Sequence, residues 1–346
     1  MTDNGLLIKL DRNNILDNPQ EIRLICNIRN EITRLPFWFN YYRNLGVSRF
    51  FFIDDHSTDG TTDFLLSQPD THVFNARTSY REANSGTAWQ NELLDLYGTG
   101  HWTIVADADE LLAYRDHETV KLPEFCAKLD REGSDMLYAF LLDLYPQDLS
   151  GAICNPGKPF YEICNYFDSD YKFVRRFGLF SNRTFRYPEI DVIGGVRMRI
   201  FYPEQLNASL YNCIRNRLVW KACNALEKMG FRFEDIPHQA PALYKVPLVK
   251  WRKGYARLTS HHITRPVRGF SENTGVLMHF KFFADFHEKA KSAARNGQYF
   301  AGSREYRHYL KYVSRNDDPM FVYEGSIKYT GSECLADYFN INKSLG

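Results

Sequence analysis

The chain has 346 residues, 25% of them charged, and a formal net charge of only +1. A chain of this length can bury a large core in one domain or two, and a nearly neutral balance gives no field that would attract nucleic acid or an acidic membrane face. We therefore expect no nucleic-acid partner, and the 15% aromatic content fits stacking on bases or sugars as well as packing in a core.

The N-terminal sequence MTDNGLLIKLDRNN lacks the basic flank and the long apolar run of a signal peptide. No later segment approaches the roughly 20 apolar residues that a membrane helix requires. We therefore expect a soluble cytoplasmic protein, with attachment to the inner face of the membrane left open. The seven cysteines include no C-x-x-C pair, which argues against a zinc site and a disulfide framework and favours free thiols.

The first predicted elements are a strand, a helix and a strand. Residues 22–28 form a mostly apolar run, and Asn30 can cap the helix that follows, with Glu31 in its first turn. Gly46 ends a helix whose apolar face recurs at spacings of three and four, through Leu35, Trp38, Phe39, Tyr42 and Leu45. Residues 47–53 are the second predicted strand, so the chain opens with a parallel crossover.

The same alternation continues along the chain. We expect a helix at residues 61–66, a strand at 72–75, a helix at 85–97 and a strand at 102–106. Parallel sheets gather their ligand sites at the carboxyl ends of strands, near the point where the strand order reverses. Polar clusters follow three of the predicted strands, at residues 27–30, 54–59 and 107–110. We therefore expect these clusters to converge on one rim of the sheet.

Beyond residue 110 the pattern is less regular. Residues 136–144 are a further predicted strand, residues 150–170 are loop-like, and residues 280–299 have a helical pattern. We expect a mostly parallel α/β catalytic domain over residues 1–245. A basic, aromatic and largely helical region over residues 246–346 would complete the acceptor site.

The apolar strand at residues 102–106 runs directly into three acids, Asp107, Asp109 and Glu110. A desolvated carboxylate without a partner costs several kcal/mol, so clustered acids at the end of a buried strand need a cation. Mg²⁺ or Mn²⁺, bridging these oxygens and the diphosphate of a nucleotide, would supply it. The alternative is that the acids are ordinary helix-start carboxylates that complement the helix dipole.

Three motifs together resemble glycosyltransferase family 2, which has the GT-A nucleotide-sugar-binding fold. They are Arg29-Asn30-Glu31, Asp54-Asp55-His56-Ser57-Thr58-Asp59-Gly60-Thr61 and Asp107-Ala108-Asp109-Glu110. The later segment Leu277-Met278-His279-Phe280-Lys281-Phe282 is similar to one common in bacterial members. The resemblance is closest up to residue 115. It implies a GT-A-like, Rossmann-related fold and the transfer, with inversion, of a sugar from a nucleoside-diphosphate sugar, with UDP expected as the nucleotide.

The same resemblance implies Mn²⁺ or Mg²⁺ as the cofactor and a glycan or glycolipid hydroxyl as the acceptor, in cell-surface polysaccharide assembly. Asp109 would hold the metal, and Asp107 would be shared between the metal and the ribose. Asp54, with Asp55 beside it, would accept a hydrogen bond from the nucleotide base. Without a nucleotide, Asp54 and Asp55 would be solvated turn residues.

Further residues are expected around the nucleotide, the metal and the acceptor. The nucleotide pocket would also be lined by Asn27, Arg29, Glu31, Arg81 and Asn84. Family members often take a further metal ligand from a late histidine, and of His261, His262 and His279 we expect His279. Two arginines, Arg197 and Arg199, would either clamp an anionic group bidentately or form a solvated basic face.

Direct displacement at the anomeric carbon needs a base within hydrogen-bond reach of the acceptor hydroxyl. Asp143 is the first choice, because it closes a strand expected to lie beside the metal motif. Glu189 and Asp191 are the other candidates, just before a pair of glycines.

Three other functions fit parts of the pattern. A haloacid-dehalogenase-like phosphatase or phosphotransferase also uses Asp-x-Asp at a strand end, but Leu111 stands where that motif expects Thr or Val. A nucleotidyltransferase would need a glycine-rich loop after its first strand, and residues 27–31 contain no glycine. A non-catalytic glycan-binding protein on a decayed transferase scaffold is the third alternative, and intact acids in all three clusters argue against decay.

Overall fold

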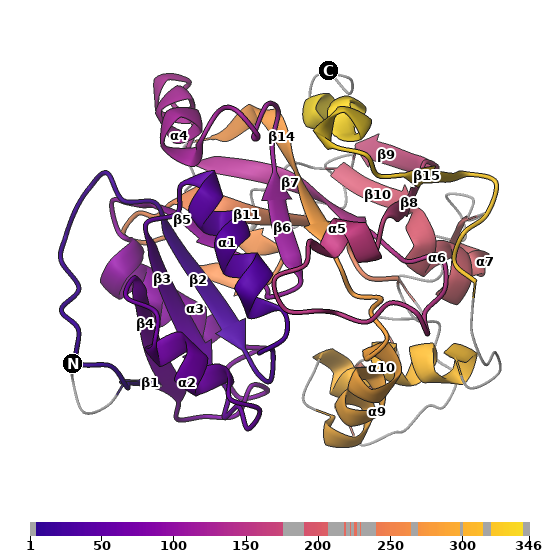
Figure 1. Ribbon diagram of the computed structural model, residues 1–346, viewed down its shortest axis with the longest axis horizontal. Helices are drawn as coiled ribbons and strands as arrows, with labels where there is room; N and C mark the ends of the chain where they lie inside the picture. The colour runs from indigo at the N-terminus through magenta and orange to yellow at the C-terminus, as the bar shows by residue number, and fades with distance from the viewer. Residues whose placement is uncertain are drawn as a thin grey trace.

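A computed structural model of the chain describes residues 5–175, 190–206, 240–263, 269–297, 300–313 and 320–341, with a few isolated positions between residues 218 and 229. Helices flank one large sheet of nine strands (Figure 1). The predicted α/β class is therefore confirmed. No helix in the described part of the chain is both long enough and apolar enough to cross a membrane.

The first part of the sheet is parallel. Its strands are β2 (Arg23–Ile28), β3 (Arg49–Asp54), β4 (Thr71–Ala76) and β5 (Trp102–Val105). The pairs β2/β3, β3/β4 and β2/β5 are all parallel, in the order β4-β3-β2-β5. The strand order therefore reverses between β2 and β5. A short strand, β1 (Leu7–Lys9), pairs antiparallel with the outer edge of β4 and was not predicted.

Helices α1 (Leu35–Leu45), α2 (Thr61–Leu66) and α3 (Thr87–Leu93) connect these strands, and a single π-helical turn at residues 94–98 extends α3. α1 buries the predicted apolar face, and Gly46 ends it with a left-handed φ of 106°. The expectation that Asn30 caps this helix is wrong. Pro36 lies in the first turn, where its missing N–H is no loss, and Asn30 adopts φ 55° in the loop before the helix.

The second part of the sheet mixes both strand directions, so the expectation of a mostly parallel sheet is wrong. β7 (Met136–Asp143) pairs in parallel with β14 (Phe270–His279). β11 (Tyr244–Lys250) runs antiparallel between β5 and β7, and β6 (Glu110–Ala113) runs antiparallel along β14. The predicted boundary between residues 245 and 246 falls inside β11, so both predicted regions contribute strands to one sheet.

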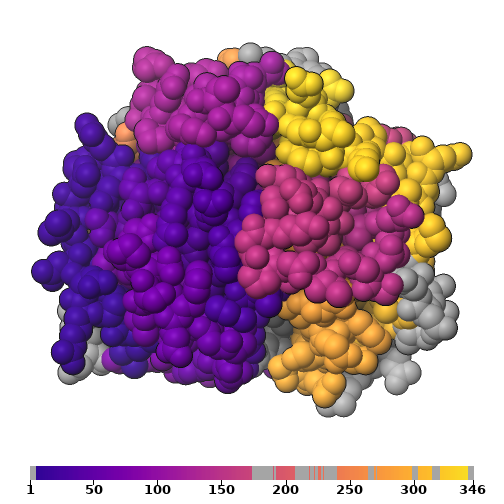
Figure 2. Space-filling model, viewed as in Figure 1, coloured from indigo at the N-terminus to yellow at the C-terminus, as the bar shows by residue number. Residues whose placement is uncertain are grey.

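The remaining elements surround this second part of the sheet. They are α4 (Leu122–Arg131), α5 (Phe160–Ile163), β8 (Tyr166–Asp168), β9 (Tyr171–Arg175), β10 (Ile190–Gly194), α6 (Gly195–Phe201), α7 (Pro203–Leu206), β12 (Arg257–Thr259), β13 (His262–Ile263), α9 (Phe286–Asn296), α10 (Phe300–Val313), β15 (Ser326–Lys328) and a 3-10 helix (Ser332–Asn340). α9 lies within the stretch predicted to be helical. In Figure 2 the orange α9 and α10 region lies directly below the magenta segment around α5.

The core is formed on both faces of the sheet. On one face, α1 packs Trp38, Phe39 and Tyr42 against Phe50 and Phe52 of β3, and all five side chains are buried. A separate buried cluster on the other face contains Trp89 of α3 and Trp251 after β11. The five cysteines within the described ranges are unpaired, as expected for a reduced chain.

Candidate functional site

The loops that follow β2 and β3 are joined into one unit by hydrogen bonds. The Asn30 N–H donates to Ser57 Oγ at 2.9 Å, and Asn30 Oδ1 accepts the Thr58 N–H at 2.7 Å. The next residue, Glu31, donates its N–H to Thr61 Oγ1 at 3.0 Å. The first two predicted polar clusters therefore converge, and Asn30 is occupied by this bracing instead of by a helix cap.

Asp54 shapes the second loop from within. Its Oδ1 accepts the Ser57 N–H at 3.0 Å and the Ser57 hydroxyl at 2.6 Å, and its Oδ2 accepts the Thr62 hydroxyl at 2.5 Å. Asp55 pairs with Arg29 at 3.1 Å, so these two predicted nucleotide residues lie together. The expected contact between Asp54 and a nucleotide base stays a prediction. Both Asp54 oxygens already accept hydrogen bonds, so the base would be an additional donor to one of them.

The third cluster is held by a lysine that sequence reasoning missed. Lys245, on β11, places its Nζ 2.8 Å from Asp107 Oδ2 and 2.5 Å from Glu110 Oε1. Glu110 also accepts the Asp107 N–H at 3.1 Å, and Trp38 Nε1 donates to the Asp107 carbonyl at 3.1 Å. The cation that pairs with Asp107 and Glu110 is therefore the ammonium group of Lys245. The signal was present in the sequence, because Lys245 interrupts an apolar run that forms a buried strand.

Replacing Lys245 by methionine is expected to lower the free energy of unfolding by about 3 kcal/mol, because Glu110 would be buried without its cation. The double variant K245M/E110Q should recover much of this loss, since it removes both charges. Lys250→Met provides a control on the same strand, because Lys250 pairs with Asp130 at the surface and such pairs contribute at most about 1 kcal/mol. Urea denaturation followed by tryptophan fluorescence measures all three; equal losses in K245M and K250M would contradict the role given to Lys245.

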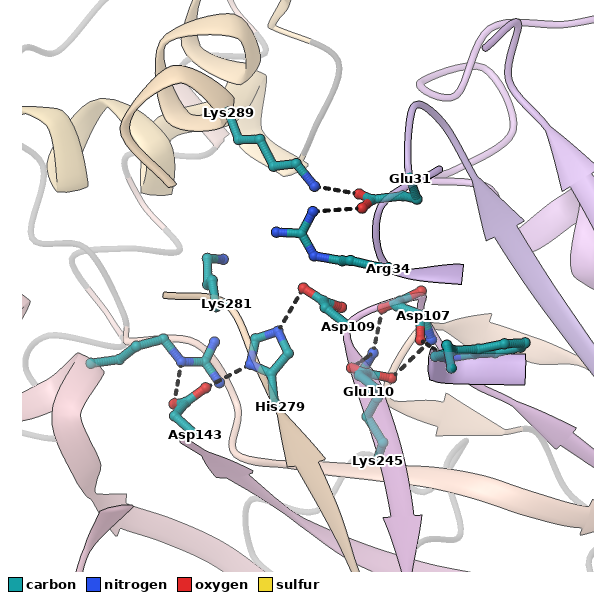
Figure 3. Close-up of polar contacts among 12 residues, drawn as sticks. Glu31, Arg34, Asp107, Asp109, Glu110, Asp143, Lys245, His279, Lys281 and Lys289 are labelled. Atoms are coloured by element: carbon teal, nitrogen blue, oxygen red, sulfur yellow. Dashed lines mark hydrogen bonds and ion pairs between the residues drawn. The ribbon is translucent and has the colours of Figure 1, made fainter. Parts of the chain in front are cut away.

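The remaining acid of the motif, Asp109, faces His279 (Figure 3). Asp109 Oδ2 lies 3.5 Å from His279 Nε2, and His279 Nδ1 lies 2.6 Å from Asp143 Oδ1. Arg197, on α6, then donates from Nε to Asp143 Oδ2 at 2.6 Å. The strand register explains the arrangement, because His279 at the end of β14 is directly opposite Asp143 on β7 and Glu110 on β6.

Charges alternate along this line of residues. Burial lowers the pKa of His279, but Asp109 and Asp143 outweigh it and raise that pKa to about 9. Burial raises the pKa of Asp109, but His279 and Arg34 hold it well below its usual range. Arg197 and His279 likewise outweigh burial and lower the pKa of Asp143. At neutral pH both carboxylates are therefore ionised and the imidazole between them is protonated.

A divalent metal at Asp109 and His279 would have to replace the proton on His279 Nε2, and other groups would have to fill the rest of its coordination. The bond from His279 Nδ1 to Asp143 fixes the imidazole with Nε2 toward Asp109, which is the carboxylate–histidine arrangement of metal ligands. Asp107 keeps its Oδ1 outside the bonds to Lys245, and half of its side chain is exposed. Within the described residues, no group of three or more His, Cys, Asp or Glu side chains is arranged to hold a metal alone. Mg²⁺ commonly takes one or two carboxylates and leaves other positions to phosphates and water.

The segment after β14 docks on the rim through ion pairs. Arg34 donates to both oxygens of Asp285 at 3.0 and 2.9 Å, and it contacts Glu31 at 2.8 Å. Glu31 also accepts from Lys289 of α9 at 2.5 Å, as Figure 3 shows. Glu31 is predicted to line the nucleotide pocket, and in the structure it connects the loop after β2 to α9 through Lys289.

The other predicted residues are dispersed. Asn27 is the second-last residue of β2, and it lies so close to Gly86 that a Cβ on Gly86 would come within 2.2 Å of the Asn27 amide nitrogen. Asn84 donates its side-chain N–H to the Leu258 carbonyl at 3.0 Å, and Arg81 is exposed in the same loop. Other predicted residues bond elsewhere: Arg199 binds Asp168, His261 Nδ1 lies 2.7 Å from the Tyr244 carbonyl oxygen, and His262 Nδ1 lies 2.8 Å from Thr259 Oγ1. Glu189 and the side chain of Asp191 lie outside the described part of the chain.

The chain matches no family model, and comparison with curated proteins finds none that is significantly similar. Function must therefore be inferred from the residues and the geometry of this rim.

Proposed function

We propose that the protein is a metal-dependent, inverting glycosyltransferase of the GT-A type. It moves a sugar from a nucleoside-diphosphate sugar, most readily a UDP sugar, to a hydroxyl of a glycan or glycolipid acceptor in cell-surface polysaccharide assembly. The observation that carries the proposal is the pairing of Asp109 with His279 at the carboxyl end of β5, next to the point where the strand order reverses.

Two neighbouring features support a nucleotide at this rim. The loops after β2 and β3 are braced to each other, so they form a rigid wall beside β5, as preorganised binding sites require. Arg34 and Lys289 bring positive charge to the same side of Asp109 (Figure 3). A bound diphosphate would replace Glu31 as the partner of Arg34 and Lys289. Donor binding would then be coupled to the docking of α9.

The metal would be held by Asp109 and His279, with Asp107 beside them. When bound, a divalent ion supplies Lewis-acid stabilisation of the charge that develops on the leaving diphosphate. Lys245 keeps Asp107 and Glu110 in place, and Asp143 holds the His279 ring through Nδ1. These chain residues thus fix the ligand oxygen and nitrogen before the donor arrives.

The same geometry gives Asp143 a positioning role in this proposal, in place of the base expected from the sequence. Its side chain is completely buried, and its two oxygens are bonded to His279 and Arg197. A base must reach the acceptor hydroxyl. An enclosed carboxylate at the far side of His279 from Asp109 is poorly placed to do so.

A thermal-shift panel tests the proposal. Mn²⁺ together with UDP or GDP at about one hundred times Kd should stabilise the protein by about 2.7 kcal/mol, or about 4 °C. Neither the metal alone nor ATP with metal should do so. A response to ATP instead would favour a nucleotidyltransferase. Stabilisation by free glycans but by no nucleotide would favour a glycan-binding protein, and turnover of a phosphate monoester without a nucleotide would favour the phosphatase.

A further inference from the structure

The proposed reaction needs a base, and the buried Asp143 is not placed to supply it. The base must be an ionised carboxylate or a neutral imidazole. It must also be partly exposed and near Asp109. In the part of the chain that the structure describes, the acids of the site are already committed: Asp107 and Glu110 to Lys245, Asp143 to Arg197, and Glu31 to two cations. A further carboxylate must therefore be sought around the site.

Glu305, on α10, meets these requirements. Its Oε1 lies 3.2 Å from Lys281 Nζ and also accepts a hydrogen bond from the Tyr309 hydroxyl. Its Oε2 makes no hydrogen bond with any residue that the structure describes, and about a third of the side chain is exposed. One oxygen is thus fixed by two donors, while the other remains able to accept a proton.

Glu305 is connected to the site through Lys281. Its partner Lys281 follows His279 by two residues, and in Figure 3 Lys281 lies to the left of the His279 ring while Asp109 lies to its right. The Lys281 Nζ lies 4.7 Å from the centre of the Tyr306 ring, the residue next to Glu305. Burial and the negative charges of Glu305, Asp109 and Asp107 all raise the pKa of Tyr306.

We infer that Glu305 is the catalytic base that removes the proton from the acceptor hydroxyl, an inference that rests on the proposed function. The acceptor oxygen forms a bond to the anomeric carbon of the donor while the bond from that carbon to the phosphate oxygen breaks. The electron pair of the broken bond stays on the leaving nucleoside diphosphate. The hydroxyl proton passes to Glu305 Oε2 and later to water, which restores the carboxylate.

The surroundings of Glu305 suit this step. Burial raises its pKa, but Lys281 and Arg197 outweigh burial and hold the pKa below its usual range, so the carboxylate is ionised before reaction. A lysine fixed over two aromatic rings keeps Oε1 in place without enclosing the whole carboxyl group. Asp143, by contrast, has both oxygens bonded and no exposure.

The test compares turnover of a nucleotide sugar with Mn²⁺ and a panel of alkyl-glycoside acceptors, read as released nucleoside diphosphate. Glu305→Gln should lower kcat by about 10²-fold to 10⁴-fold and leave the thermal shift with nucleoside diphosphate unchanged. Added formate should restore part of the activity of E305A. Glu288→Gln, which breaks an exposed glutamate–lysine pair on α9, is the matched control and should be fully active.

The variant Lys281→Gln distinguishes a catalytic role of Glu305 from a purely structural role of the Lys281–Glu305 pair. If Glu305 is the base, K281Q stays active and the acid limb of its kcat/KM profile moves to higher pH, because loss of the lysine raises the pKa of Glu305. The inference is overturned if E305Q keeps more than half of the wild-type kcat. It is also overturned if E305Q and K281Q lose activity equally and formate does not rescue E305A, or if E189Q or D191N is inactive while E305Q is active. A wild-type protein that turns over no nucleotide sugar would instead sink the proposed function itself.

Discussion

Replacing Asp109 by asparagine is expected to reduce glycosyl transfer by about 10³-fold and to abolish the stabilisation by nucleoside diphosphate and Mn²⁺. Asparagine keeps the size of the side chain but removes the charge that would bind the metal beside His279. The fold should survive, because Asp109 is partly exposed and His279 retains its bond to Asp143. Transfer and thermal shift should be measured on the same preparations.

The matched control for D109N is Asp116→Asn. Asp116 is an exposed acid in the loop after β6, at φ 63°, a conformation that asparagine tolerates well. It should keep wild-type transfer and the wild-type response to Mn²⁺. Wild-type transfer by D109N, with D116N as reference, would show that Asp109 is not a metal ligand.

The second large effect is expected at the buried pair of Asp143 and Arg197. Asp143→Asn should lower the free energy of unfolding by about 3 to 4 kcal/mol, because Arg197 would be left buried without a counter-charge. At a low temperature at which this variant still folds, its affinity for Mn²⁺ in the presence of nucleoside diphosphate should fall by about 10-fold to 100-fold. The reason is that His279 would lose the carboxylate that orients it.

Asp70→Asn is the control for the stability loss, because Asp70 pairs with Arg43 at the surface and such a pair is worth at most about 1 kcal/mol. Urea denaturation and titration with Mn²⁺ give the two readouts. An Asp143→Asn protein with wild-type stability and metal affinity but no turnover would return Asp143 to the role of base.

The first part of the fold could be predicted because its signals are local. Strands β2, β3 and β5 are mostly apolar runs, and α1 carries its apolar residues at helical spacing. Each strand ends in a polar cluster, so the placement of Asp54 and Asp107 on one rim followed from the rule for parallel sheets. The loops meet as expected, although Asn30 performs the bracing instead of capping a helix.

The second part could not be predicted, because its pairings join residues far apart in the sequence. β11 reaches β5 across more than one hundred residues, and it brings Lys245 to Asp107 and Glu110. Nothing local in the sequence sets the register that places His279 opposite Asp143. The roles proposed for Asp143 and Glu305 depend on burial and on partners distant in the sequence. The sequence pattern alone therefore favours Asp143, which ends a predicted strand.

The most direct measurement is the product of the reaction itself, followed by proton NMR with a UDP sugar or GDP sugar, Mn²⁺ and an alkyl-glycoside acceptor. We predict that free nucleoside diphosphate and a new glycosidic linkage appear in equal amounts, with the anomeric configuration of the transferred sugar inverted and product formation in D109N reduced by about 10³-fold. Intact nucleotide sugar after prolonged incubation, together with consumption of ATP or of a phosphate monoester, would contradict the proposed function.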